Sequence, residues 1–196
     1  LFRSLVEHAV VNILPISERP ASGAKVHVNA NLQTDFSMHQ ALSLFLLDTL
    51  PALDEDSTTY HLDLITLVEC ILEDPAVILR KQLDRAKGDR VAELKAQGME
   101  YDERMLELEK VEYPKPLRDF LYDSFNEFAN DHPWLEEENV RPKSIVREML
   151  ESYLTFSGYI KHYGLQRSEG LLLRHVNNVY KVLLHTVPIE AKNDLV

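Results

Sequence analysis

Apolar residues recur every three or four positions from Phe36 almost to the end of the chain, which is the period of an α-helix with one buried face. Prolines and short polar runs interrupt this period repeatedly, so the helices are expected to be of ordinary length. Only 6 of the 196 residues are glycine, and the alternation typical of strands is nearly absent. The sequence therefore predicts an all-α fold, an irregular bundle of about eight helices with at most one short N-terminal strand.

The expected helices begin and end at residues that suit helix termini. Ser37 stands at capping-box spacing before an apolar run that Pro51 ends. The strongly apolar segment from Tyr60 to Leu72 is expected at the centre of the core, and Pro75 suits the start of the next helix. Further helices are expected over residues 116–128, 142–156 and 169–185.

The N-terminal region differs from the rest. Residues 1–14 have helical spacing up to Pro15, whereas Lys25–Asn29 alternates and is either a short strand without an obvious partner or an extended linker. The chain begins at Leu1 without Met, and we expect a piece of a longer polypeptide. In that arrangement residues 1–31 end a preceding region and form a linker, residues 32–190 are the helical domain, and residues 191–196 begin the next segment.

Residues 76–112 form a distinct charged stretch. They are dense in Lys, Arg, Asp and Glu, their apolar positions are sparse, and Gly88 and Gly98 are the expected breaks. We expect two or three exposed helices here, arranged as a charged helical hairpin that projects from the body.

Charge and composition exclude several classes of protein. The chain carries 21 Lys and Arg against 32 Asp and Glu, a net charge of -11, which would repel nucleic acid and anionic membranes if it were spread evenly. The sequence contains no apolar run long enough for a transmembrane helix, so no membrane association is expected. The single cysteine, Cys70, cannot form an internal disulfide, which favours a reducing compartment and a cytoplasmic location.

Catalytic and metal-binding patterns are missing from the sequence. No Gly-Lys pair forms a phosphate-binding loop, and none of the eight histidines stands at the spacing of a metal pair. Cys70 lies among apolar residues and is expected to be a buried, inert thiol. We therefore expect no catalytic residues, no metal site and no cofactor in this chain itself.

One charge asymmetry runs against the acidic average. Residues 141–181 hold seven Lys and Arg against three Glu. The last predicted helix carries a polar stripe at helical spacing: Arg174, Asn177, Asn178 and Lys181. Such a stripe is either an ordinary solvent-exposed face or a surface that follows phosphates without reading bases.

Five stretches of the sequence resemble a known family. They are Gln33–Ser37, Gln40–Ser43, Tyr113–Pro116, Arg141–Ser144 and Gly164–Arg174, the last being the most specific. Together they resemble the C-terminal domain of unknown function that is appended to bacterial Ski-like DEAD/DEAH-box (DExH) helicases, over about residues 32–190. The last stretch is similar, more distantly, to the C-terminal helical domain of eukaryotic exosome-associated RNA helicases.

This resemblance implies a role and a set of contact residues. It implies a parent chain with two RecA-like domains that use ATP and Mg²⁺ to move single-stranded RNA, braced by a helical domain of which one helix lines the RNA path. The ATPase motifs are absent here, so this chain would not hydrolyse ATP alone. The residues that match the family by position are Arg167, Glu169, Gly170 and Arg174. Arg174 is the first candidate for RNA-backbone contact, with Arg167, Asn178 and Lys181 beside it. Gly170 would let another helix or RNA backbone approach closely, because it has no Cβ.

Two other interpretations remain open at the level of sequence. In the first, the chain is a protein-interaction module that docks a protein partner through the charged helices of residues 76–112, without RNA contact. In the second, which no residue constellation favours, it is a small-molecule enzyme. Trp134 either stacks on a base or packs against the core or a neighbouring domain.

Overall fold

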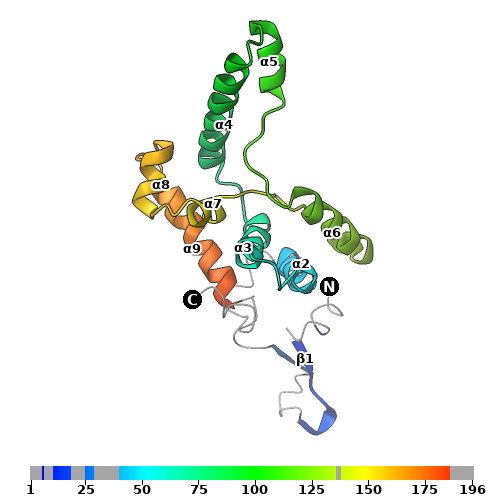
Figure 1. Cartoon of the computed structure of the whole chain (residues 1–196). Helices are drawn as coiled ribbons and strands as arrows, with labels where there is room; N and C mark the ends of the chain where they lie inside the picture. Colours follow the sequence, from blue (N-terminus) through cyan, green and yellow to red (C-terminus); the bar gives the residue numbers. More distant parts are fainter. Residues whose placement is uncertain (1–5, 7–10, 19–24, 29–39, 136–137, 186–196) are drawn as a thin grey trace.

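The computed structural model describes residues 6, 11–18, 25–28, 40–135 and 138–185. This part of the chain contains eight α-helices, so the all-α prediction is confirmed (Figure 1). The first four are α2 (Gln40–Thr49), α3 (Tyr60–Cys70), α4 (Ala76–Ala96) and α5 (Tyr101–Glu109). The others are α6 (Arg118–Asp131), α7 (Val146–Glu151), α8 (Phe156–Tyr163) and α9 (Glu169–His185). Short 3₁₀ turns occur at η1 (Ile16–Glu18), η3 (Leu50–Ala52) and η4 (Pro133–Leu135).

Two short strands precede the helices. Strand β1 (Val11–Ile13) pairs antiparallel with β2 (Val26–Val28). Of the two interpretations left open for residues 25–29, the structure shows the short strand, and β1 is the partner that the sequence did not reveal. The helix expected over residues 1–14 is wrong at β1, because two β-branched residues there favour a strand and Pro15 disfavours helix in the residue before it. The other residues of that predicted helix lie outside the described part, except Val6, which is helical.

Helix α3 lies at the centre of the main core, as its apolar sequence predicts. Its buried side chains pack with those of α2, α6 and α9. Aromatic rings join α2 to α6, since Phe45 contacts Phe125 and Phe128 edge-on at centroid distances of 5.3 and 5.7 Å. A second cluster joins the start of α4 to α8 and α9 through Ile78, Tyr159 and Leu172. Helix α9 contributes to both clusters, because Val179 belongs to the first.

Helices α4 and α5 form the projecting hairpin that the charge pattern predicts (Figure 1). The predicted break at Gly88 is wrong, since α4 continues through it to Ala96. One glycine costs a helix only about 1 kcal/mol, and the helix-favouring residues around it outweigh that cost. Gly98 does separate the two helices, with a φ of 75° that suits glycine. Leu94 is fully buried and an Arg90–Glu107 contact of 3.8 Å links the two helices.

The single helix predicted over residues 142–156 is also wrong. Residues 142–145 are buried without helical structure, and α7 begins only at Val146. Tyr153 then takes a φ of 51°, which ends α7 before α8 starts behind the cap Thr155. The hydroxyl of Thr155 accepts a hydrogen bond of 3.1 Å from the Gly158 amide. Buried contacts of Lys143 and Arg147 hold this segment in place.

Candidate functional site

Helix α9 has a buried side that fixes its position in the fold. Leu172, His175 and Val179 are buried, and α9 packs against α3. His175 Nε2 lies 2.8 Å from Glu69 Oε1, and both side chains are almost completely shielded from solvent. A histidine–carboxylate contact in the interior therefore joins α9 to the central helix.

The same Glu69 carboxylate also holds the start of α7. Its oxygens accept hydrogen bonds from the backbone amides of Ile145 at 3.0 Å, Val146 at 2.9 Å and Arg147 at 3.3 Å. These amides have no partner within their own helix, so a carboxylate satisfies them and interacts favourably with the helix dipole. One buried acidic group thus connects α3, α7 and α9.

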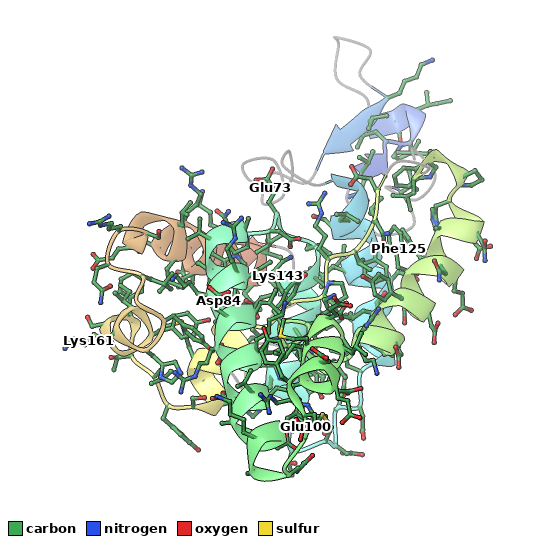
Figure 2. The ribbon with its side chains drawn as sticks, turned by 90° about the horizontal axis from the view of Figure 1, so that it is seen from above. Glu73, Asp84, Glu100, Phe125, Lys143 and Lys161 are labelled. Carbon is green, nitrogen blue, oxygen red and sulfur yellow. The ribbon has the colours of Figure 1, made fainter. Side chains whose placement is uncertain are left out.

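Lys143 completes this buried network from the segment before α7. Figure 2 shows it in the midst of the helices. Its Nζ donates to the carbonyl oxygens of Glu69 at 2.9 Å and Leu72 at 2.7 Å, and pairs with Asp74 at 3.1 Å. The lysine therefore caps the C-terminal carbonyls of α3. Burial lowers the pKa of Lys143, and Asp74 acts in the opposite direction.

Arg147 is a second buried cation of the basic segment. Its guanidinium bonds to Asp63 at 2.7 Å, to the Thr66 hydroxyl at 2.9 Å and to Glu151 at 2.9 Å. Of the seven cations in residues 141–181, Lys143 and Arg147 are thus interior structural groups. These two cations therefore do not contribute to a basic surface.

The sequence contained a signal for this network that the pattern of helical spacing did not reveal. Glu69 is the one carboxylate in the run of apolar residues between Leu64 and Leu72, and a buried helix retains such a group only with partners. Spacing along the chain did not identify those partners, because Lys143 and His175 are 74 and 106 residues away. Only the packing of three helices brings them together.

The other side of α9 carries the predicted polar stripe. Arg174, Asn177 and Lys181 are exposed, whereas Asn178 is half-buried at the edge of the packed side. Arg174 and Lys181 are two helical turns apart and lie on one face. Arg167 is exposed in the short connection before α9. Within the part of the chain that the structure describes, neither Arg167 nor Arg174 makes an ion pair.

An exposed apolar stripe runs beside these cations. Leu173 and Tyr180 are each 60% exposed and Leu184 is 48% exposed. Their spacing of seven and four residues places them along one line on the helix. The sequence pattern did not identify this stripe. The outer face of α9 therefore combines positive charge with uncovered apolar surface.

The remaining sequence predictions have mixed outcomes. A Cβ on Gly170 would meet no described atom within 4 Å, so no close helix contact within the described chain explains this glycine. An approach by RNA or another domain stays a prediction.

Trp134 is about one-third exposed and contacts His132 edge-on at 5.7 Å. Cys70 is buried as expected, and burial raises the pKa of its thiol to about 12.

A separate pocket of about 280 Å³ lies between α2 and α6. Its lining includes Asp48, Glu127, Asp131 and His132, and His132 Nδ1 lies 2.7 Å from the Phe128 carbonyl oxygen. Across the described ranges, no three His, Cys, Asp or Glu side chains are placed to hold a metal ion. None of the residues predicted to contact RNA lines this pocket.

None of the described helices combines the length and the apolar character needed to cross a bilayer.

No curated protein and no solved structure matches the chain significantly. A family described as a domain of unknown function (DUF3516) matches residues 1–196, which is the whole chain. The chain therefore belongs to this DUF3516 family.

Proposed function

We propose that this chain is the helical accessory domain of an ATP-dependent RNA helicase, and that the outer face of α9 lines the path of single-stranded RNA. One observation supports the proposal most strongly. The buried His175–Glu69 contact fixes α9 in the fold, while Arg174 and Lys181 on its other side are exposed to solvent. A rigid helix with exposed cations suits a surface along which a nucleic-acid backbone slides. The resemblance of Gly164–Arg174 to helicase C-terminal domains agrees with this role.

The chemistry of the contact is electrostatic. Arg174, Lys181 and Arg167 would bind phosphate oxygens, and the amide of Asn178 would add a hydrogen bond at the edge. Because the whole chain carries a charge of -11, phosphates would be repelled from most of its surface and confined to this face. Contacts to the backbone alone give binding that falls steeply with salt and depends little on sequence.

The apolar stripe fits the bracing part of the role. Leu173, Tyr180 and Leu184 expose surface that a soluble domain normally covers. We assign this stripe to contact with the RecA-like domains of the same parent chain, beside the RNA. ATP and Mg²⁺ would bind to those domains, in the cytoplasm, and this chain would supply positioning residues and no catalytic group.

Fluorescence anisotropy with a labelled single-stranded RNA tests the proposal. Affinity is measured for the 196-residue chain at several salt concentrations, and again for the Arg174→Ala/Lys181→Ala double variant. We expect salt-dependent binding, and a salt slope reduced by about 1.4 in the variant, since each lost phosphate contact to a single strand removes about 0.7.

A matched control uses two other exposed cations. Arg80→Ala/Lys81→Ala on α4 changes the net charge by the same amount. We expect RNA affinity to change little in this control. Equal weakening in both double variants would show that only net charge matters, and unchanged affinity in the α9 variant would remove α9 from the RNA path.

A further inference from the structure

Helix α5 exposes apolar side chains that nothing in the described chain covers. None of its nine residues is buried, yet Tyr101 is 63%, Met105 44% and Leu106 62% exposed. Single exposed apolar residues are ordinary, but three within six positions of one short helix form a patch. The patch lies on the hairpin that projects from the body (Figure 1). It is therefore accessible to another molecule.

The arrangement of this face is regular. Asp102, Met105, Leu106 and Glu109 follow one another at helical spacing and lie on the outer side of α5. The half-buried residues Arg104, Glu107 and Leu108 form the opposite side, which faces α4. Two apolar side chains thus stand between two carboxylates, which are seven residues or about 10 Å apart along the helix.

The charge of the face selects one kind of ligand. Helix α5 has four carboxylates and one arginine, and that arginine lies over the Tyr101 ring at 5.8 Å. Glu107 is already paired with Lys110 at 2.6 Å. Among the described residues, Asp102 and Glu109 have no cationic partner. An acidic face of this kind repels nucleic acid and attracts a basic segment.

The base of the hairpin is firmly held, so the face is presented in a fixed position. Ile78 and Leu79 of α4 are buried against the second core cluster. Gln82 Nε2 donates to Glu148 Oε2 at 2.7 Å and to the Tyr159 hydroxyl at 3.0 Å, which ties α4 to α7 and α8. Figure 2 labels Glu100, which lies in the turn between α4 and α5.

We propose that the outer face of α5 is a docking site for a basic amphipathic helix of a partner protein. Apolar side chains of the partner pack on Tyr101, Met105 and Leu106, and flanking Lys or Arg side chains pair with Asp102 and Glu109. This mode of recognition uses anchors one helical turn apart. The proposal assigns partner binding within residues 76–112 to one face of α5. The site is independent of RNA binding by α9.

A designed peptide tests the site directly. The probe is an 18-residue amphipathic helix with leucines at positions i, i+3, i+4 and i+7 and lysines on both flanks. Its affinity for the whole chain is measured by fluorescence anisotropy, and its contact surface by shifts of backbone amide resonances. We expect shifts confined to residues 99–110 and a loss of affinity of at least tenfold in Met105→Ser/Leu106→Ser.

Two controls separate docking from general attraction to an acidic protein. Leu173→Ser/Tyr180→Ser removes exposed apolar surface of similar size from α9 and should leave peptide affinity unchanged. A peptide with glutamates in place of lysines should not bind. Circular dichroism checks that both double variants keep their helices, as expected because all four side chains are exposed.

Several results would overturn the proposal. They are absence of peptide binding, amide shifts spread over other acidic surfaces, or equal loss in both double variants. Self-association in ultracentrifugation that Met105→Ser/Leu106→Ser abolishes would assign the face to a second copy of the chain instead. RNA binding that the same variant abolishes would assign it to nucleic acid.

Discussion

At the scale of single residues, the position of α9 depends on the Glu69 carboxylate. It contacts His175 of α9 and three backbone amides at the start of α7, and it is fully buried. Lys143 does not replace these contacts, because its Nζ binds the Glu69 carbonyl and Asp74. Removing the acid would leave buried donors without acceptors, which costs more than the mean value of a hydrogen bond.

We therefore predict that Glu69→Gln lowers the free energy of unfolding by about 3 kcal/mol. An amide keeps the shape of the side chain but offers one acceptor oxygen and no charge. Urea unfolding monitored by circular dichroism measures the loss. The exposed Glu103→Gln is the matched control, expected to change stability by less than about 0.5 kcal/mol. Similar stability of both variants would contradict the structural role of Glu69.

Cys70 gives the stability a dependence on pH. Its thiol pKa is raised from 9.0 to about 12 by burial, so above pH 9 the unfolded chain loses this proton while the folded chain keeps it. The folded state then binds more protons, and stability falls as pH rises through this interval, by about 1.4 kcal/mol per pH unit. The full contribution of the thiol is present below pH 9.

Cys70→Ala isolates this contribution. Urea unfolding at pH 8, 10 and 11 should show a shallower alkaline loss for the variant than for the natural chain. Contributions of groups that do not interact with Cys70 are common to both proteins and cancel in the comparison, whereas the nearby Lys143 loses its interaction with the thiolate in the variant. Parallel losses in the two proteins would mean that the thiol ionises as readily in the folded state as in the unfolded one.

At the scale of elements, the local sequence pattern predicted most helices correctly. It gave wrong helix bounds where contacts with distant residues determine the backbone conformation. Apolar spacing predicted α3 and α9 nearly to their ends, because each has one continuous packed face. It failed for residues 142–145, where Pro142 suggested a helix start. The buried bonds of Lys143 and the capping of α7 by Glu69 hold that stretch in a non-helical form. Those partners are more than 70 residues away in sequence.

The two glycines of the hairpin differ in a way that stability measurements can detect. Gly88 lies inside α4, and a Cβ added there would meet no described atom within 4 Å, so Gly88→Ala should stabilise the chain by about 1 kcal/mol. Gly98 has a φ of 75°, so Gly98→Ala should destabilise it by about 1 kcal/mol. Hydrogen exchange of the α4 amides measures the change in stability in both variants. Effects of the same sign would contradict the assigned backbone conformations.

At the scale of the whole molecule, the acidic and basic surfaces lie on different elements. The hairpin ends in an acidic helix α5 (Figure 1). Helix α9 exposes cations and an apolar stripe to solvent. The candidate residues Arg174 and Lys181 could be chosen from sequence, because helical periodicity alone places them on one face. The sequence did not show that Lys143 and Arg147 are buried, or that the His175–Glu69 contact holds α9 in place. Both facts depend on the packing of α3, α7 and α9.

Photocrosslinking tests the central claim most directly. A single-stranded RNA containing 4-thiouridine is bound to the 196-residue chain at low salt and irradiated, and the attached peptides are identified by mass spectrometry. If the outer face of α9 is the RNA path, crosslinks should fall within residues 167–185 and disappear in Arg174→Ala/Lys181→Ala. Crosslinks concentrated on the α4–α5 hairpin, or none within residues 167–185, would contradict it.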